Sequence, residues 1–112
     1  MNETLLAPSY KGSIECIESW HNEDYSLWYR KYSDGFIEQG GQLNLANTPT
    51  TVNLNIPFNT NVYAVIATPS KNYNNYGAMA TYNQTTTNFS VVATRSKEGY
   101  SCYNINWIAK GY

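Results

Sequence analysis

The pattern of apolar and polar residues predicts several short β-strands. The clearest alternation covers residues 52–56, whose apolar face holds Val52, Leu54 and Ile56. A second alternation covers residues 100–109, whose apolar face holds Tyr103, Ile105, Trp107 and Ala109. One small sheet cannot bury both faces, so we expect them to meet across a core between two sheets.

A β-hairpin is predicted for residues 28–41, around the dipeptide Asp34-Gly35. Both residue types tolerate positive φ, which a two-residue type I′ turn requires at both central positions. This turn predicts the cross-strand pairs Tyr32 with Ile37, Lys31 with Glu38, and Arg30 with Gln39. An aromatic–aliphatic pair and an opposite-charge pair favour that register.

The remaining strands are predicted at residues 62–68, 77–82 and 89–94, and residues 13–20 are expected to be irregular or a short strand. Six to seven short strands at spacings of about ten residues, without a convincing helix, predict an all-β fold. We expect a small antiparallel β-sandwich over residues 17–112. Residues 1–16 are expected to form an N-terminal tail or a connector.

The composition of the chain argues against nucleic acid and membranes as partners. Only 13% of the residues are charged and the net charge is -1, so the chain has no basic face for nucleic acid. It has no apolar run of eighteen residues for membrane insertion, and Met1-Asn2-Glu3-Thr4 does not resemble a secretory signal. Cys16 and Cys102 are expected to be reduced thiols, although a disulfide between them stays possible.

Neither a metal site nor a catalytic site is expected. The spacing Glu18-x-x-His21 binds metals on helices of four-helix bundles, where a second copy is present, and this chain has no second copy. Because His21 is the only histidine, one chain cannot supply a zinc site, although identical chains around an axis could share one. Its acidic neighbours are interpreted as part of a solvated segment that contains Glu15, Glu18, His21, Glu23 and Asp24.

A pair of catalytic carboxylates is the remaining enzymatic possibility, and Asp34 and Glu38 are the nearest candidates. The turn explains Asp34, and a pair with Lys31 explains Glu38. The chain also lacks a nucleophile beside His21 and a glycine-rich phosphate loop. We therefore interpret the chain as a binding protein, not an enzyme, without a cofactor.

Aromatic residues in the second half are the best candidates for a ligand site. Sugars stack their apolar ring faces on aromatic side chains while amides fix their hydroxyls, and the loop 70–76 offers both groups. Trp107 and Tyr103 alternate with polar residues and are expected in the core instead. The predicted ligand-binding residues are Tyr73, Asn74, Asn75, Tyr76, Tyr82 and Tyr100.

Three segments carry a resemblance to a known family. The segment IESWHNEDYSLWYRKYSDGFIEQGG, Ile17 to Gly41, resembles the start of phage tail-fibre C-terminal domains, in which IES, WYR, YSDG and EQGG recur in this order. VNLNIPF resembles the apolar strand of that family, and NINWIAKG resembles its closing W-x-A-x-G. The loop 21–24 departs from the family, which often has small polar residues and glycine there.

This resemblance implies a β-sandwich similar to H-type lectin domains, assembled as a homotrimer at the tip of a virion tail fibre and made in the host bacterial cytoplasm. It implies recognition of a bacterial surface component, expected to be a glycan, with three weak contacts strengthened by multivalency. The N-terminal segment would join the domain to the fibre shaft. Two alternatives stay open: a trimerisation cap without its own ligand, and a free-standing bacterial lectin.

Overall fold

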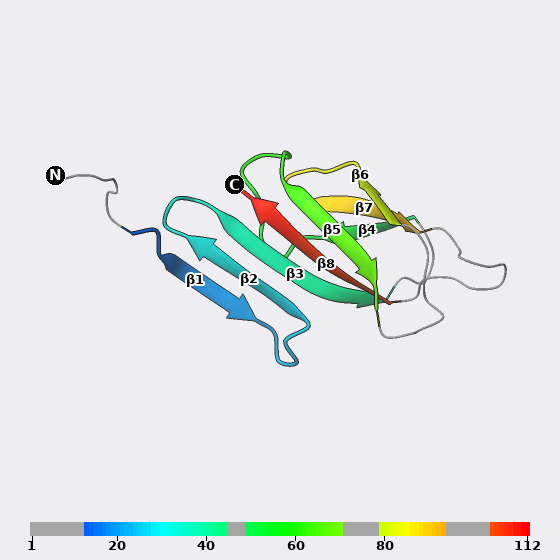
Figure 1. Cartoon of the computed structure of the whole chain (residues 1–112), viewed down its shortest axis with the longest axis horizontal. Coiled ribbons are helices and arrows are strands. Elements are labelled where there is room, and N and C mark those ends of the chain that lie inside the picture. The colour runs from blue at the N-terminus through cyan, green and yellow to red at the C-terminus, as the bar shows by residue number, and fades with distance from the viewer. Residues whose placement is uncertain (1–12, 45–48, 71–78, 94–103) are drawn as a thin grey trace.

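The computed structural model of the chain describes residues 13–44, 49–70, 79–93 and 104–112. These residues form eight β-strands and no helix (Figure 1). The strands are β1 Cys16–His21, β2 Leu27–Tyr32, β3 Ile37–Asn44, β4 Thr50–Asn53, β5 Ala64–Pro69, β6 Met79–Tyr82, β7 Asn88–Ala93 and β8 Asn104–Gly111. Within these ranges, no helix is long and apolar enough to cross a membrane.

The strands form two antiparallel sheets, as the sequence predicted. One has five strands in the order β1-β2-β3-β8-β5, and the other has three strands in the order β4-β7-β6. Figure 1 shows the three-stranded sheet behind β8 and β5. The structure has one strand more than the six to seven expected. This strand is β1, in the segment for which we predicted irregular structure or a short strand.

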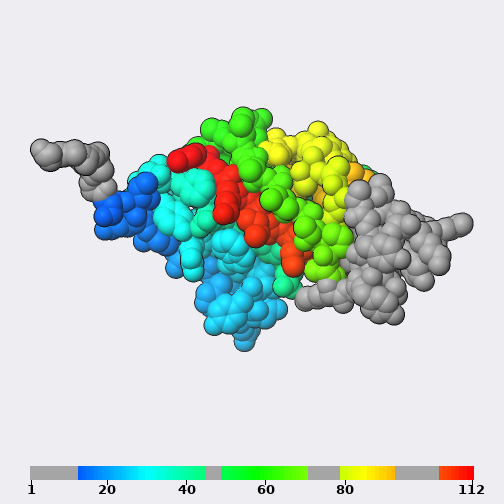
Figure 2. All heavy atoms as spheres, viewed as in Figure 1, coloured from blue at the N-terminus to red at the C-terminus, as the bar shows by residue number. Residues whose placement is uncertain are grey.

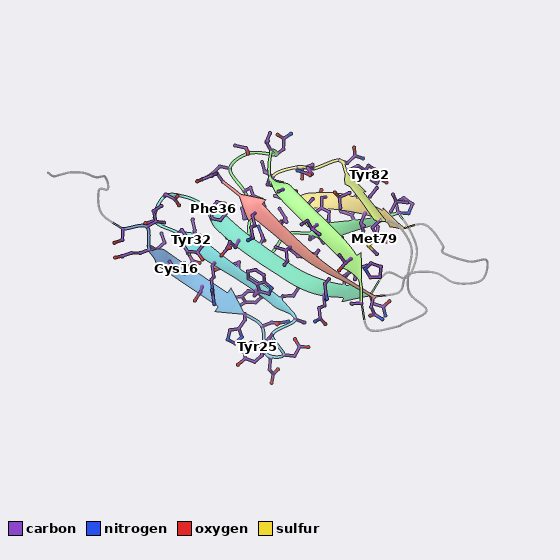
Figure 3. All side chains as sticks on the ribbon, in the orientation of Figure 1. Cys16, Tyr25, Tyr32, Phe36, Met79 and Tyr82 are labelled. Carbon is purple, nitrogen blue, oxygen red and sulfur yellow. The ribbon has the colours of Figure 1, made fainter. Side chains whose placement is uncertain are left out.

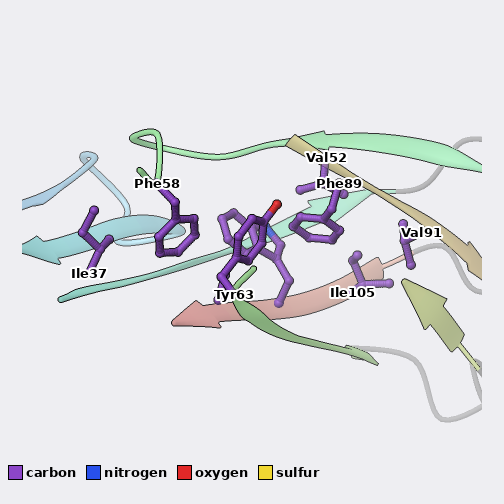
Figure 4. Packing of buried hydrophobic residues seen from close by; sticks show 9 residues of the cluster. Ile37, Val52, Phe58, Tyr63, Phe89, Val91 and Ile105 are labelled. Carbon is purple, nitrogen blue, oxygen red and sulfur yellow. The ribbon is translucent and has the colours of Figure 1, made fainter. Parts of the chain in front are cut away.

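The core lies between β8 and the three-stranded sheet. Its buried residues include Ile105 and Trp107 of β8 and Val52 and Phe89 of the opposite sheet (Figure 4). The rings of Phe89 and Trp107 meet edge to face at 5.6 Å between centroids. The prediction that the Val52-Leu54-Ile56 face meets the Ile105-Trp107 face across a core is therefore confirmed, while Tyr103 lies outside the described residues.

The turn of the β2–β3 hairpin differs from the prediction. Tyr32 N–H donates to the Phe36 carbonyl at 2.9 Å and Gly35 N–H donates to the Tyr32 carbonyl at 2.9 Å, which closes a three-residue loop. In the described hairpin only Gly35 has positive φ, at 92°, so the turn is not type I′. Asp34 instead accepts a hydrogen bond from Phe36 N–H at 3.0 Å. A three-residue loop with a left-handed glycine is the next most common hairpin connection.

The longer loop shifts the register by one residue, so all three predicted pairs are wrong. Lys31 pairs with Ile37, and Arg30 pairs with Glu38. The ion partner of Glu38 is Lys110 of β8, with 3.3 Å between Nζ and Oε2, instead of the predicted Lys31. Arg30 and Glu38 therefore lie on the same face of the sheet.

A buried glutamine ties the chain after β4 to β3. Gln39 is 0% exposed, and its Nε2 donates to the Ile56 carbonyl at 2.9 Å. Its Oε1 accepts from the backbone N–H groups of Asn55 at 2.8 Å and Ile56 at 3.1 Å. Because these N–H groups bond to a side chain, β4 ends at Asn53 and not at Ile56 as the alternation suggested. The side chain of Leu54 still packs against the core.

The two glycines that follow Gln39 permit close packing on both faces of the sheet. A Cβ on Gly40 would lie 2.6 Å from the Trp107 carbonyl oxygen and 2.8 Å from Cζ2 of Trp28. A Cβ on Gly41 would lie 2.6 Å from Cδ2 of Leu27. The Trp107 carbonyl oxygen belongs to the backbone and cannot move aside, so position 40 requires glycine, whereas a Cβ at position 41 would first have to displace the end of the Leu27 side chain. The EQGG motif therefore serves folding.

The β1–β2 hairpin extends past the three-stranded sheet. All six residues of β1 are exposed, and Figure 1 shows β1 and β2 beyond the region that the three-stranded sheet covers. One face of the five-stranded sheet packs against the three-stranded sheet at β8. On the same face of the β1–β2 hairpin, Trp20 stacks on Tyr29 with 5.7 Å between ring centroids, and Trp20 remains 42% exposed. The hairpin thus has no second layer within the described residues.

Candidate functional site

The outer face of the five-stranded sheet, the side away from the three-stranded sheet, carries a row of aromatic and polar side chains. Trp28 pairs with Gly40, and Arg30 pairs with Glu38, across β2 and β3. On β1, His21 pairs with Trp28, so it lies on this face as well. Figure 2 shows this face, where atoms of β1, β2, β3, β8 and β5 form one continuous surface.

Trp28 lies flat against the sheet because its partner has no side chain. The Cζ2 and Cε2 atoms of its indole ring lie 2.8 and 3.0 Å from where a Cβ of Gly40 would be. The ring is therefore supported from below by backbone, and it is only partly buried. A fixed, half-exposed aromatic face is suited to stacking against the apolar face of a ligand.

The β1–β2 turn places a second aromatic group beside Trp28. Asn22 shapes this turn: its Nδ2 donates to the Ser26 hydroxyl and its Oδ1 accepts from Leu27 N–H, both at 3.0 Å. Tyr25 has a φ of 62° and stacks on the His21 ring at 4.0 Å between centroids. The Tyr25 side chain is 68% exposed and reaches the rim of the site. Non-glycine residues with left-handed backbone are uncommon and often found at functional positions.

These side chains line an open groove of about 570 Å³, which we call the Trp28 groove. It is bordered by six residues of the outer face and its turn, Ser19, His21, Tyr25, Trp28, Arg30 and Glu38, and by Trp20 and Tyr29, whose side chains lie on the other face. A smaller hollow of about 220 Å³ borders Trp28 as well, and Gln42, Asn106 and Ile108 contribute to its lining. The indole thus borders both hollows, and amide groups are close to it.

Glu38 is held as a carboxylate at the inner end of the Trp28 groove. The Tyr32 hydroxyl donates to its Oε1 at 2.7 Å, and Lys110 Nζ lies 3.3 Å from its Oε2. The Tyr32 hydrogen bond is the main reason that the pKa of Glu38 is lowered, and Lys110 lowers this pKa further. The same bond raises the pKa of Tyr32. Both carboxylate oxygens therefore already have partners.

Replacing Tyr32 with phenylalanine is expected to raise the pKa of Glu38 toward its ordinary value, because the main donor to the ionised carboxylate is lost. The folded pKa lies below the unfolded one, so this bond stabilises the fold above the unfolded pKa. That stabilisation is lost as pH falls through the folded pKa. The variant should therefore be less stable than the wild type near neutral pH, with the difference shrinking in acid.

Carboxyl carbon NMR titration of Glu38, with urea unfolding at neutral and acidic pH, measures both effects. Tyr29→Phe is the matched control, since the Tyr29 hydroxyl donates to Glu18 and not to Glu38. An unchanged Glu38 pKa in the Tyr32 variant would contradict the assignment.

The sequence-predicted ligand residues do not lie in this groove as far as the structure describes them. Tyr82 is on β6 and is 40% exposed. Figure 3 shows it far from Tyr25, at the opposite side of the molecule. The other five, Tyr73, Asn74, Asn75, Tyr76 and Tyr100, lie outside the described residues.

The acidic residues near His21 do not converge in the described part of the chain. Glu18 pairs with Lys31 and His21 pairs with Trp28, which places the two side chains on opposite faces of β1. No group of three potential metal ligands occurs among the described residues. Cys16 is an exposed free thiol, and Cys102 lies outside the described residues.

Comparison with protein families gives one match. Residues 31–112 match the model of the tail fibre protein gp53-like C-terminal family. The match begins inside β2 and includes β3 to β8. A search of curated proteins found no match.

Solved structures of pyocin tail fibres have a similar fold. An N-truncated R2-type pyocin tail fibre aligns with a TM-score of 0.65 and 16% identity over 88% of this chain and 39% of that one. A C-terminal fragment of the P. aeruginosa R2 pyocin fibre aligns with a TM-score of 0.66 and 17% identity, over 87% of this chain and 26% of that one. An N-truncated R1-type pyocin tail fibre aligns with a TM-score of 0.60 and 18% identity, over 87% of this chain and 88% of that one. The chain thus spans well under half of the two R2 fragments.

Proposed function

This chain belongs to the gp53-like tail fibre C-terminal family, and we propose that it is a trimeric receptor-binding domain that recognises a bacterial surface glycan. The expected place of action is the tail fibre of a virion or of a related particle. The observation that carries the glycan proposal is the half-exposed Trp28 ring, supported by Gly40 and bordered by Arg30 and His21.

The chemistry of the Trp28 groove matches that of a shallow sugar site. A pyranose ring has an apolar face that can stack on the indole, while its hydroxyls need donors and acceptors beside that ring. Ser19 and Arg30 supply such groups in the groove, and Gln42 and Asn106 supply them in the adjoining hollow. The groove is open rather than enclosed, which suits one or two units of a long surface polysaccharide.

Binding without cleavage is part of the proposal. Glycoside hydrolysis requires two carboxyl groups free to act on the scissile bond. Glu38 is engaged by Tyr32 and Lys110, and Asp34 accepts a hydrogen bond in the hairpin turn. These two candidates therefore have structural roles.

The trimer is supported by the uncovered side of the β1–β2 hairpin. Trp20 and Tyr29 form an aromatic pair there without a second layer among the described residues, and Trp20 is 42% exposed. Exposed apolar groups gathered on one surface often mark protein contacts. Three open grooves held together would raise a weak single-site affinity through effective concentration.

The same hairpin surface favours one other function, a cap that trimerises a fibre and binds no ligand. An array of bacterial surface polysaccharides, probed with the domain after light scattering has fixed its mass, separates the two. We expect a trimer that binds a subset of the glycans. A trimer that binds none favours the cap, and a monomer at high concentration contradicts both.

A further inference from the structure

We propose that the Trp28 groove selects an acidic saccharide, whose carboxylate or phosphate group contacts Arg30 while the sugar ring stacks on Trp28. This inference rests on the proposed glycan-binding function and specifies the chemical class of the ligand.

Arg30 has hydrogen-bonding capacity that the fold does not use. Its side chain is exposed, and among the described residues it forms no ion pair within 4.0 Å. Its neighbour Glu38 already binds the Tyr32 hydroxyl and Lys110. The guanidinium also acts on the Tyr32 hydroxyl, where it opposes the rise in the pKa of Tyr32, but it has five N–H donors. Donors therefore remain for an anionic group, which arginine can bind with two parallel hydrogen bonds.

The charges around Arg30 favour an anion at this end of the groove. Arg30 and Lys110 are both positive, and Glu38 is the one carboxylate between them in the described structure. Glu38 interacts with both Lys110 and Arg30, so the three side chains together keep one net positive charge. The Arg30 end of the Trp28 groove is thus positively charged.

Acidic residues lie in the turn beside the Tyr25 end of the groove, although they do not line it. Glu23 and Asp24 lie in the turn that carries Tyr25, and Asp24 accepts a hydrogen bond from Ser26 N–H at 3.0 Å. The pKa of Asp24 is lowered by its hydrogen bonds with Ser26, so it is ionised at neutral pH. An acidic sugar is therefore expected to place its anionic group near Arg30 and its hydroxyls toward Tyr25.

The test uses the full chain and four sets of oligosaccharides on one array: uronate-containing, ulosonate-containing, phosphorylated and neutral. We expect at least tenfold tighter binding to one acidic set than to neutral sugars, with the gap narrowing as salt is added. The carboxylated and phosphorylated sets identify which anion is bound. Equal binding to neutral and acidic sugars overturns this inference but leaves the proposed function intact. Absence of binding to every set overturns both.

Variants of two β2 residues test whether the preference for acidic sugars depends on Arg30. Arg30→Met should lose at least tenfold in affinity for the acidic sugar, because a charge-assisted hydrogen-bonded pair is removed. Arg30→Lys should retain part of it. Lys31→Met is the matched control, since Lys31 is the next residue on β2 and faces the other side of the sheet. An equal loss for the Lys31 variant would show a nonspecific charge effect and would overturn the proposal.

Discussion

Replacing Gln39 with leucine is expected to lower the free energy of unfolding by about 3 kcal/mol or more. The substitution removes three hydrogen bonds and leaves the N–H groups of Asn55 and Ile56 and one carbonyl without their partner. Each unsatisfied buried polar group costs about 1–3 kcal/mol. Urea unfolding at a fixed protein concentration measures the loss.

Gln42→Leu is the matched control for this variant. Gln42 is on the same strand as Gln39 but is exposed on the outer face, so its replacement should change stability by less than about 0.5 kcal/mol. If the two leucine variants are equally stable, the 54–58 segment is not held by Gln39. In that case the structural role given to the EQGG motif would be wrong.

Replacing Trp28 with alanine is expected to reduce glycan affinity by about tenfold to a hundredfold. Covering a large aromatic side chain is worth about 1.5–3 kcal/mol, and each 1.4 kcal/mol corresponds to a factor of ten. Isothermal titration with the glycan selected from the array measures the change. Light scattering and thermal unfolding should first show that the variant keeps the mass and fold of the wild type.

Tyr82→Ala makes this test decisive between two candidate sites. Tyr82 is an exposed aromatic residue on β6, and it belongs to the set that the sequence predicted as ligand-binding. The groove account expects unchanged affinity for this variant. If Tyr82→Ala loses binding and Trp28→Ala does not, the ligand site lies in the second half of the chain, as the sequence predicted.

Much of the fold could be predicted because inner and outer residues alternate along the strands. In β8, Ile105, Trp107 and Ala109 are buried while Asn106 and Ile108 are exposed, which is the pattern in the sequence. Apolar side chains at every second position of a strand lie on one face of the sheet, and that face packs against the core. Fold class and core therefore follow from local sequence.

The hairpin register could not be predicted by the same reasoning, because it depends on which residue adopts positive φ. Asp34 and Gly35 both tolerate that conformation, but only Gly35 uses it. The extra loop residue shifts every pair in β2 and β3 by one position. As a result, Glu38 lies opposite Arg30 on β2 instead of Lys31.

The Trp28 groove was missed because it depends on contacts between three strands. The sequence LWYRKY alternates, and this alternation could have placed Trp28 and Arg30 on one face of β2. That Trp28 has a glycine beneath it follows only from the pairing with Gly40. The family motifs gave no help in locating a ligand, since EQGG and W-x-A-x-G consist largely of residues that pack or turn the chain.

The most direct test of the central claim is a crystal structure of the domain with a bound oligosaccharide from the array. We expect a sugar ring stacked on Trp28, with its anionic group within hydrogen-bond distance of Arg30. A sugar bound at Tyr82, with the Trp28 groove empty, would contradict it.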